Sequence, residues 1–119
     1  MLKEVIEVKQ EPGRRRRWFQ DDEIELIVWY GASGGVEGFQ LCYRAADRWE
    51  RALTWRHGTG FTHDRVDLGD TNPFKNQTPI LIPDGTVPWD TLTATVQARS
   101  GNLEAYLSAL VLERLTARR

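Results

Sequence analysis

The residues best suited to acid–base chemistry lie in the segment "THDRVD", which runs from residue 62 to residue 67. His63, Arg65 and Asp67 are spaced two residues apart, so a β-strand would put all three side chains on one face. An imidazole beside a guanidinium and a carboxylate can bind an anion or transfer a proton. The same side chains on a solvent-exposed strand would form an ordinary salt-bridged surface, which is the interpretation that the sequence favours.

The single cysteine, Cys42, lies two residues after Gln40 in an apolar segment. It would act as a nucleophile if a base such as His63 reached it. A lone cysteine within an apolar strand is more often a small buried hydrophobic residue, and we predict that role. One sulfur excludes an internal disulfide and a thiolate zinc cluster, and the acids near His63 lack any recognised metal-ligand spacing. We therefore expect neither a metal nor another cofactor.

Four consecutive arginines, Arg14–Arg17, are followed at once by Trp18. Arginines beside aromatic rings are typical of single-stranded nucleic-acid binding, in which the bases stack on the rings. The aromatic residues that could form such a stacking surface are Trp18, Trp49, Trp55 and Phe61. Core packing is the commoner role of aromatic residues in strands, and we favour it here.

The arginine run is matched by acids within the next few residues. These acids are Asp21, Asp22, Glu23 and Glu25. A hairpin that turns at Asp21-Asp22 would bring the two signs face to face, with Trp18 opposite Glu25. We therefore expect the arginines to pair with the acids of their own hairpin, which argues against nucleic-acid binding.

Alternating apolar and polar residues predict a series of strands in the first two thirds of the chain. The segments cover residues 2–9, 23–30, 36–45, 48–58, 60–70 and 80–83. Turn-forming residues separate them, among them Pro12-Gly13 and the glycine-rich stretch 31–35. Short sequential connections indicate an antiparallel meander of about five to six strands.

The hydrophobic period changes from two residues to 3.6 after Pro88, which predicts a helix over 88–99. Asn102 is placed to cap a second helix. The apolar stripe of that helix comprises Leu103, Tyr106, Leu107, Leu110, Val111 and Leu115. Strands first and helices last predict an α+β fold in a single domain, 1–119, with a sheet over about 2–83 and a helical pair over about 88–117 packed on one sheet face.

The composition is that of one folded domain without long-range attraction for polyanions. The chain has 119 residues, and its 16 basic and 17 acidic side chains give a formal net charge of −1. A protein with so small a net charge exerts no long-range electrostatic attraction on a nucleic acid. No apolar run approaches the ~20 residues of a membrane span, and the first residues do not form a signal peptide. We expect a cytoplasmic protein without membrane association.

Several blocks of the sequence resemble a family of small bacterial proteins to which no function is assigned. The blocks are "RRWF" (16–19), "ELIVW" (25–29), "GFQLCY" (38–43), "ERALTW" (50–55), "GFTHDRVD" (60–67) and "TPILIPDG" (78–85). They occur in one order and cover most of the chain. Glu25 stands where the family has aspartate, and Asp64 stands where it has a second histidine, which weakens any paired-histidine metal site. The resemblance implies no activity.

The resemblance directs attention to the polar residues within the sheet-forming blocks. These are Arg17, Gln40, Glu50, Arg51, His63, Arg65 and Asp67. If they converge, we expect a non-enzymatic binding or interaction module whose site takes a small anionic ligand or a protein partner. One alternative is a small hydrolase or isomerase in which His63 is the general base and Arg51 or Arg65 holds an anion. The other is single-stranded nucleic-acid binding through Arg14–Arg17 and exposed tryptophan, and homodimer formation through a sheet face or edge is also open.

Overall fold

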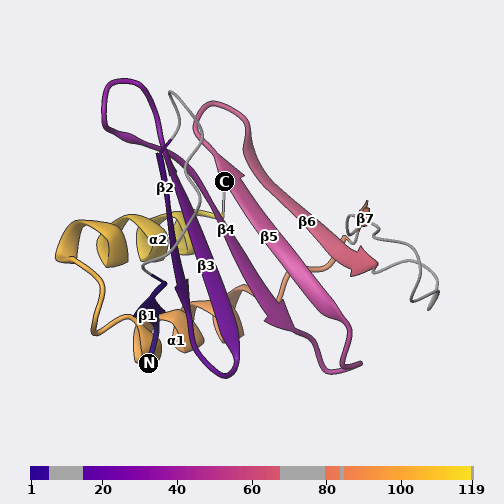
Figure 1. The fold of residues 1–119 in the computed structure, drawn as a ribbon. Coiled ribbons are helices and arrows are strands. Elements are labelled where there is room, and N and C mark those ends of the chain that lie inside the picture. The colour runs from indigo at the N-terminus through magenta and orange to yellow at the C-terminus, as the bar shows by residue number, and fades with distance from the viewer. Residues whose placement is uncertain (6–14, 68–79, 84, 119) are drawn as a thin grey trace, which may run out of the picture.

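The computed structural model describes residues 1–5, 15–67, 80–83 and 85–118 (Figure 1). It confirms the α+β fold: an antiparallel meander is followed by two helices. Seven strands are hydrogen-bonded in sequence order, so the sheet is slightly larger than expected. The strands are β1 (Lys3–Glu4), β2 (Arg15–Gln20), β3 (Ile24–Tyr30), β4 (Val36–Arg44), β5 (Glu50–Arg56), β6 (Gly60–Asp67) and β7 (Ile80–Pro83).

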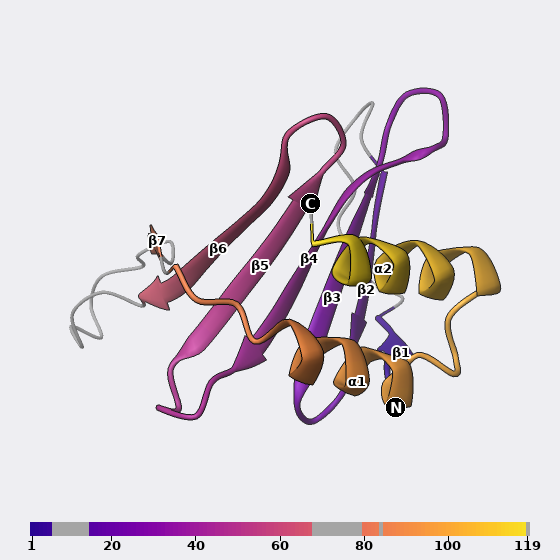
Figure 2. The same ribbon diagram turned by 180° about the vertical axis from the view of Figure 1, so that it is seen from behind.

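The strand register gives the sheet two faces of different character. Leu26 of β3 pairs with Leu41 of β4, which pairs with Leu53 of β5, and all three are fully buried. Because side chains alternate along a strand, the residues two positions away share this face. Figure 2 shows that both helices cover this side of the sheet, which we call the helix-covered face. The opposite side is called the second face.

Helices α1 (Trp89–Arg99) and α2 (Ala105–Ala117) each bury one narrow stripe against the helix-covered face. Apolar residues three to four positions apart lie on one side of a helix, and this spacing selects the buried set. The buried residues of the two helices are Leu92, Val96, Leu107, Val111 and Leu115. Tyr106 belongs to the predicted stripe but is 52% exposed, and its hydroxyl lies 2.7 Å from that of Tyr30.

The start of α2 differs from the prediction. The helix begins after Glu104, and no side chain caps it. Asn102 instead donates its amide N–H to the carbonyl oxygen of Leu2 at 3.2 Å. An asparagine side chain satisfies whichever backbone group is nearest, and here the chain's first residues lie closer than the helix end. Asn102 therefore fastens the N-terminal segment to the α1–α2 connection.

The β2–β3 hairpin is shifted by two residues relative to the predicted pairing. Trp18 lies opposite Ile27, and Glu25 lies opposite Gln20. The Asp21 carboxylate accepts the backbone N–H groups of Glu23 at 2.8 Å and of Ile24 at 2.9 Å, and the Asp21 N–H donates to the carbonyl oxygen of Ile24 at 3.0 Å. The turn is therefore centred on Asp22 and Glu23, one residue later than predicted. A shift of two keeps every side chain on its predicted face.

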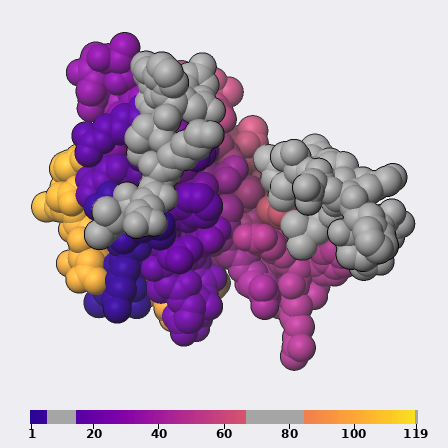
Figure 3. All heavy atoms as spheres, viewed as in Figure 1, coloured from indigo at the N-terminus to yellow at the C-terminus, as the bar shows by residue number. Residues whose placement is uncertain are grey.

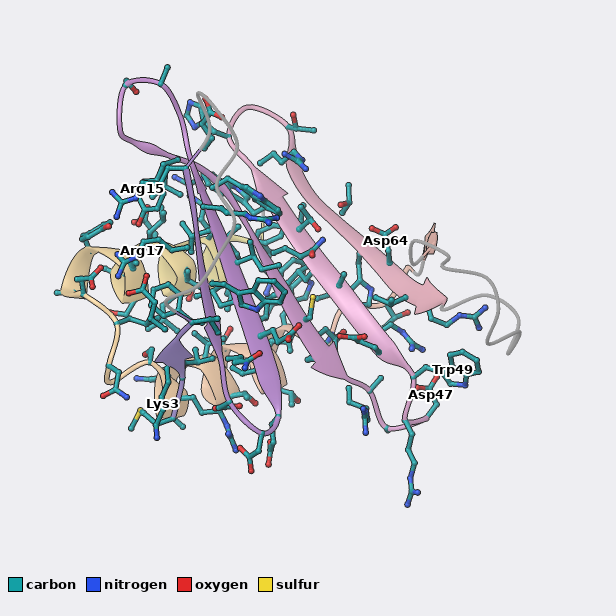
Figure 4. The ribbon with its side chains drawn as sticks, viewed as in Figure 1. Lys3, Arg15, Arg17, Asp47, Trp49 and Asp64 are labelled. Carbon is teal, nitrogen blue, oxygen red and sulfur yellow. The ribbon has the colours of Figure 1, made fainter. Side chains whose placement is uncertain are left out.

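The predicted pairing with the acids of the same hairpin does not hold for Arg17. Arg99 of α1 forms the ion pairs with those turn acids, namely Asp21, Asp22 and Glu23. Arg17 lies on the helix-covered face and instead forms ion pairs with Glu4 and Glu104. In Figure 4 the Arg17 side chain is directed toward α2. Arg14 lies outside the described residues.

Candidate functional site

A pocket of about 1120 Å³ lies at the end of the sheet where β3 begins and β4 ends. Its walls come from the β2–β3 turn, the ends of β4 and β5, and α1 with the residues before it. In Figure 3 the surface is notched at its lower edge, between the β2–β3 turn and the β4–β5 turn. The lining contains side chains from both sheet faces, so the sheet divides the pocket into a helix-side half and a second-face half.

The helix-side half contains a hydrogen-bonded tyrosine–histidine pair. Tyr43 Oη and His63 Nε2 lie 2.5 Å apart, and the two rings are nearly parallel at 15°. Tyr43 is 7% exposed and His63 is 9% exposed, so bulk water has little access to the pair. A buried hydroxyl that is hydrogen-bonded to an imidazole can exchange a proton with it.

Arg51 lies beside this pair on the same face. It is the cross-strand partner of Tyr43 and of Arg65, and it is 9% exposed. Its guanidinium donates to the Asp47 carboxylate at 2.6 Å and to the carbonyl oxygen of Trp49 at 3.2 Å. The hydrogen bond from Arg51 holds the pKa of Asp47 below its usual range, and the N–H of Trp49 acts in the same direction. The β4–β5 turn therefore sets the orientation of Arg51.

Hydroxyl groups form the opposite wall of the helix-side half. Thr91 and Thr95 lie one turn apart on α1, and Thr86 precedes the helix. Leu92 and Ile24 add apolar surface between the threonines and the sheet. This half thus combines a guanidinium, an imidazole, a phenol and several hydroxyls, which is the usual mixture of a site for a small polar ligand.

The acids at the rim are already engaged in ion pairs. Asp21 binds Arg99 at 2.8 Å, and its carboxylate side chain is only 4% exposed. Burial by itself would raise the pKa of Asp21, but hydrogen bonds from the N–H groups of Glu23 and Ile24 and from Arg99 hold it well below its usual range. Asp21 therefore stabilises the turn and is poorly suited to accept a proton from a ligand.

The second-face half contains a different cluster, formed by Glu25, Cys42 and Glu50. Their ligand atoms all lie within 4.8 Å of one another, so this is the group among the described residues that could hold a metal ion. Burial raises the pKa of the Cys42 thiol to about 12, and the charges of Glu50 and Glu25 add to the effect. Burial and the charge of Glu50 also raise the pKa of Glu25.

Cys42 is not placed to act as a nucleophile, which was the alternative to its predicted role as a small buried residue. With its raised pKa the thiol is protonated at neutral pH, and it donates weakly to Gln40 Oε1 at 3.7 Å. His63 lies on the opposite face of the sheet and cannot take its proton. Cys42 is 8% exposed and packs with Ala52 and Val66, as a small buried residue does.

The structure separates the predicted site residues into groups. Arg51 and His63 line the helix-side half, and Glu50 lines the second-face half. Arg65 shares the face of Arg51 but lies outside the pocket lining, with its guanidinium 5.1 Å above the Trp49 ring. The remaining members are Gln40, which donates to Thr54 on the second face, Arg17, which lies near α2, and Asp67, whose side chain is outside the described part of the chain.

Sequence reasoning missed Tyr43 and misjudged the burial of His63. The alternation of β4 correctly put Tyr43 on the apolar face, but only the strand register shows that it reaches His63. The exposed-face interpretation of His63 is wrong. The connection from β7 to α1 crosses this face of the sheet, as Figure 2 shows, and contributes Thr86 and Pro88 to the wall beside the histidine.

The aromatic residues do not share one stacking surface, which was the alternative to their predicted role in core packing. Trp55 is buried on the helix-covered face, where it stacks on Phe39 with ring centroids 5.7 Å apart. Phe61 packs edge-on against Phe39 on the same face. Trp18 lies on the second face, because it pairs with Ile27. Core packing, the commoner role, therefore describes Trp55 and Phe61.

No family model, no curated protein and no solved structure matches this chain. Among the described residues, neither helix has the length and apolar character that crossing a membrane requires.

Proposed function

We propose that this protein binds a small anionic ligand in the helix-side half of the pocket. The observation that carries the proposal is the convergence of Arg51, His63 and Tyr43, each at least nine-tenths buried, on one pocket wall. A guanidinium is the side chain best suited to hold a carboxylate or a phosphate, because it offers a planar fork of N–H donors. A few convergent polar groups beside apolar lining, here Leu92 and Ile24, are also the usual form of a small-molecule site.

The distribution of charge supports an anion in this half. The turn acids are paired with Arg99, and Glu25 and Glu50 lie on the far side of the sheet from Arg51. Arg51 pairs with Asp47 and has Arg65 as its cross-strand neighbour. The turn acids are thus paired with Arg99, and the other two acids of the pocket lie on the second face, which suits an anion beside Arg51 better than a cation.

The proposal extends to the setting of the protein and to its other ligands. We propose a bacterial cytoplasmic protein, in keeping with the resemblance and the single cysteine.

A protein partner is the second candidate for what this protein binds, and the exposure of Trp49 favours it. The Trp49 side chain is 50% exposed, and the Arg65 guanidinium lies over its ring. Tryptophan and arginine are enriched among the residues that contribute most to the affinity of protein interfaces. Replacement of Trp49 with alanine would then abolish capture of that partner without affecting ligand binding.

A titration of labelled protein with inorganic phosphate, acetate and pyruvate tests the main proposal. We expect NMR shifts confined to residues of the helix-side half. Arg51→Gln should weaken binding by about tenfold or more, because it removes a charge-assisted hydrogen bond worth roughly 1.5–3 kcal/mol. Arg48→Gln is the matched control, since Arg48 is an exposed arginine in the same turn. Equal binding by Arg51→Gln and wild type would contradict the proposal.

A further inference from the structure

We propose that the Tyr43–His63 pair makes this pocket a proton-transfer site for a small 2-oxo acid. Arg51 would hold the carboxylate of the substrate, and Tyr43 would remove a proton from the carbon next to its carbonyl group. The inference rests on the proposed binding of a small anion. It adds a reaction and a substrate class to that pocket.

The geometry of the pair supports a proton relay. The separation of 2.5 Å between Tyr43 Oη and His63 Nε2 is at the short end of hydrogen-bond distances. Both side chains are more than nine-tenths buried, and a hydrogen bond is stronger where water is excluded. A phenol alone is a poor base at neutral pH, but an imidazole within reach can accept its proton as the phenol oxygen acts.

Arg51 is placed to stabilise the charge that develops. It lies directly across from Tyr43 in the sheet register, on the same face and in the same pocket. Side chains of such cross-strand partners lie about 5 Å apart at their Cβ atoms. A guanidinium at this position stabilises negative charge on the phenol oxygen and on a substrate enolate. The enolate oxygen can also accept a hydrogen bond from a threonine of α1.

The step is balanced without a co-reactant. The substrate C–H bond breaks, and its electron pair moves through the carbonyl group to give an enolate. The proton passes to Tyr43 Oη while the phenol proton passes to His63 Nε2. The products are a neutral Tyr43, an imidazolium and an enolate, and reversal returns a proton to carbon. Nothing is oxidised or reduced.

Hydrolysis through a covalent intermediate is not indicated, because the pocket offers no protein nucleophile activated by a base among the described residues. The Cys42 thiol is on the second face, away from His63. The hydroxyls of Thr91 and Thr95 lie on the α1 wall, and Thr95 donates to the carbonyl oxygen of Thr91 at 2.8 Å. Isomerisation through an enolate needs only a base and anion-stabilising donors, which this wall supplies.

Exchange of carbon-bound hydrogen in D₂O tests the inference without knowledge of the natural substrate. Pyruvate and 2-oxobutyrate are incubated with the protein, and loss of their C3 proton signals is followed by ¹H NMR. We expect the wild type to exchange these protons at least about tenfold faster than buffer at the same pH. Tyr43→Phe and His63→Gln should return exchange to the buffer rate, and Arg48→Gln should match the wild type.

Parallel binding measurements distinguish the two proposals. Tyr43→Phe should retain pyruvate binding, because Arg51 still holds the carboxylate, while its exchange is lost. Wild-type protein that binds both oxo acids but exchanges them at the buffer rate would overturn the proton-transfer inference and leave anion binding in place. Full exchange by folded Tyr43→Phe or His63→Gln would also overturn it. Absence of binding by the wild type would overturn both proposals.

Discussion

Asp21 shows how much one side chain can determine at a hairpin turn. Its two oxygens accept the N–H groups of Glu23 and Ile24 and the guanidinium of Arg99, so it joins the β2–β3 turn to the end of α1. The same contacts fix the start of β3, where the pocket begins. Because the contacts are made by the ionised carboxylate, the stability that Asp21 contributes depends on pH.

Asp21→Asn is expected to lower the free energy of unfolding at pH 7 by about 1–2 kcal/mol, because a charge-assisted hydrogen bond is lost. The folded-state pKa of Asp21 lies below the ordinary value of 3.8, so its contribution is present above that pH and is lost as the pH falls further. Urea unfolding between pH 7 and pH 2 should show that the unfolding free energies of the wild type and of Asp21→Asn converge at acid pH. A difference independent of pH would contradict this account.

Glu25→Gln is expected to have the opposite effect. Burial and the charge of Glu50 raise the pKa of Glu25, so its ionised form destabilises the folded state above the ordinary glutamate range. The substitution should stabilise the protein at pH 7 by on the order of 0.5 kcal/mol. The gain should disappear below about pH 4, where Glu25 is protonated in both states. Glu37→Gln, at an exposed position in the same strand as Cys42, serves as the control and should leave stability unchanged in thermal unfolding.

At the scale of elements, the path of β4 depends on a glycine. The register between β3 and β4 shifts at Trp29 and Tyr30, and Gly38 lies opposite Trp29. A Cβ atom at Gly38 would lie 2.5 Å from the carbonyl oxygen of Trp55 in β5. Since backbone atoms of a central strand cannot move aside cheaply, this position tolerates no side chain.

Gly38→Ala is expected to destabilise the protein by about 2–3 kcal/mol, because the β4–β5 ladder must distort to admit the methyl group. Gly35→Ala is the matched control, since the nearest atom to its added Cβ is Ser33 Oγ at 3.8 Å. Urea unfolding of the two variants measures the difference. Equal stability would mean that the strands separate more easily than the sheet geometry indicates.

The elements themselves were largely predictable from the sequence, and the residues at their ends were less so. Alternation of period two placed β3, β4, β5 and β6, and the change to period 3.6 placed both helices. These patterns are local, because each element must bury its own apolar side chains. The β2–β3 register and the start of α2 were mispredicted because Asp21 and Asn102 bind backbone groups whose positions the local pattern does not specify.

At the scale of the whole molecule, Arg17 holds three distant segments together. It forms ion pairs with Glu4 of β1 and Glu104 before α2, and its own strand is β2. The hydrogen bonds that Arg17 donates to Glu4 and Glu104 raise its pKa beyond the ordinary value. Its guanidinium, with a side chain 13% exposed, is committed to internal contacts rather than presented to a phosphate backbone.

We therefore expect this protein to lack the affinity for single-stranded nucleic acid that an arginine-rich arm would give it. Fluorescence anisotropy with a labelled oligothymidylate at 50 mM and 200 mM NaCl should show no saturable binding at micromolar protein. A true phosphate-binding arm would lose affinity steeply between these two salt concentrations. Saturable binding with that salt dependence, reduced in an Arg15→Gln Arg16→Gln variant, would contradict the expectation.

The sequence by itself indicated an antiparallel meander, the two C-terminal helices and the apolar face of each strand, because periodicity and turn residues act over a few neighbouring positions. It also identified Arg51 and His63. The order of the strands came from the structure. Only the tertiary structure brought Tyr43 to His63 and divided the predicted site between two sheet faces. It also decided that Arg17 meets Glu104 and Arg99 meets Asp21, pairs separated by 87 and 78 residues. Such contacts depend on how whole elements pack, and no local pattern encodes them.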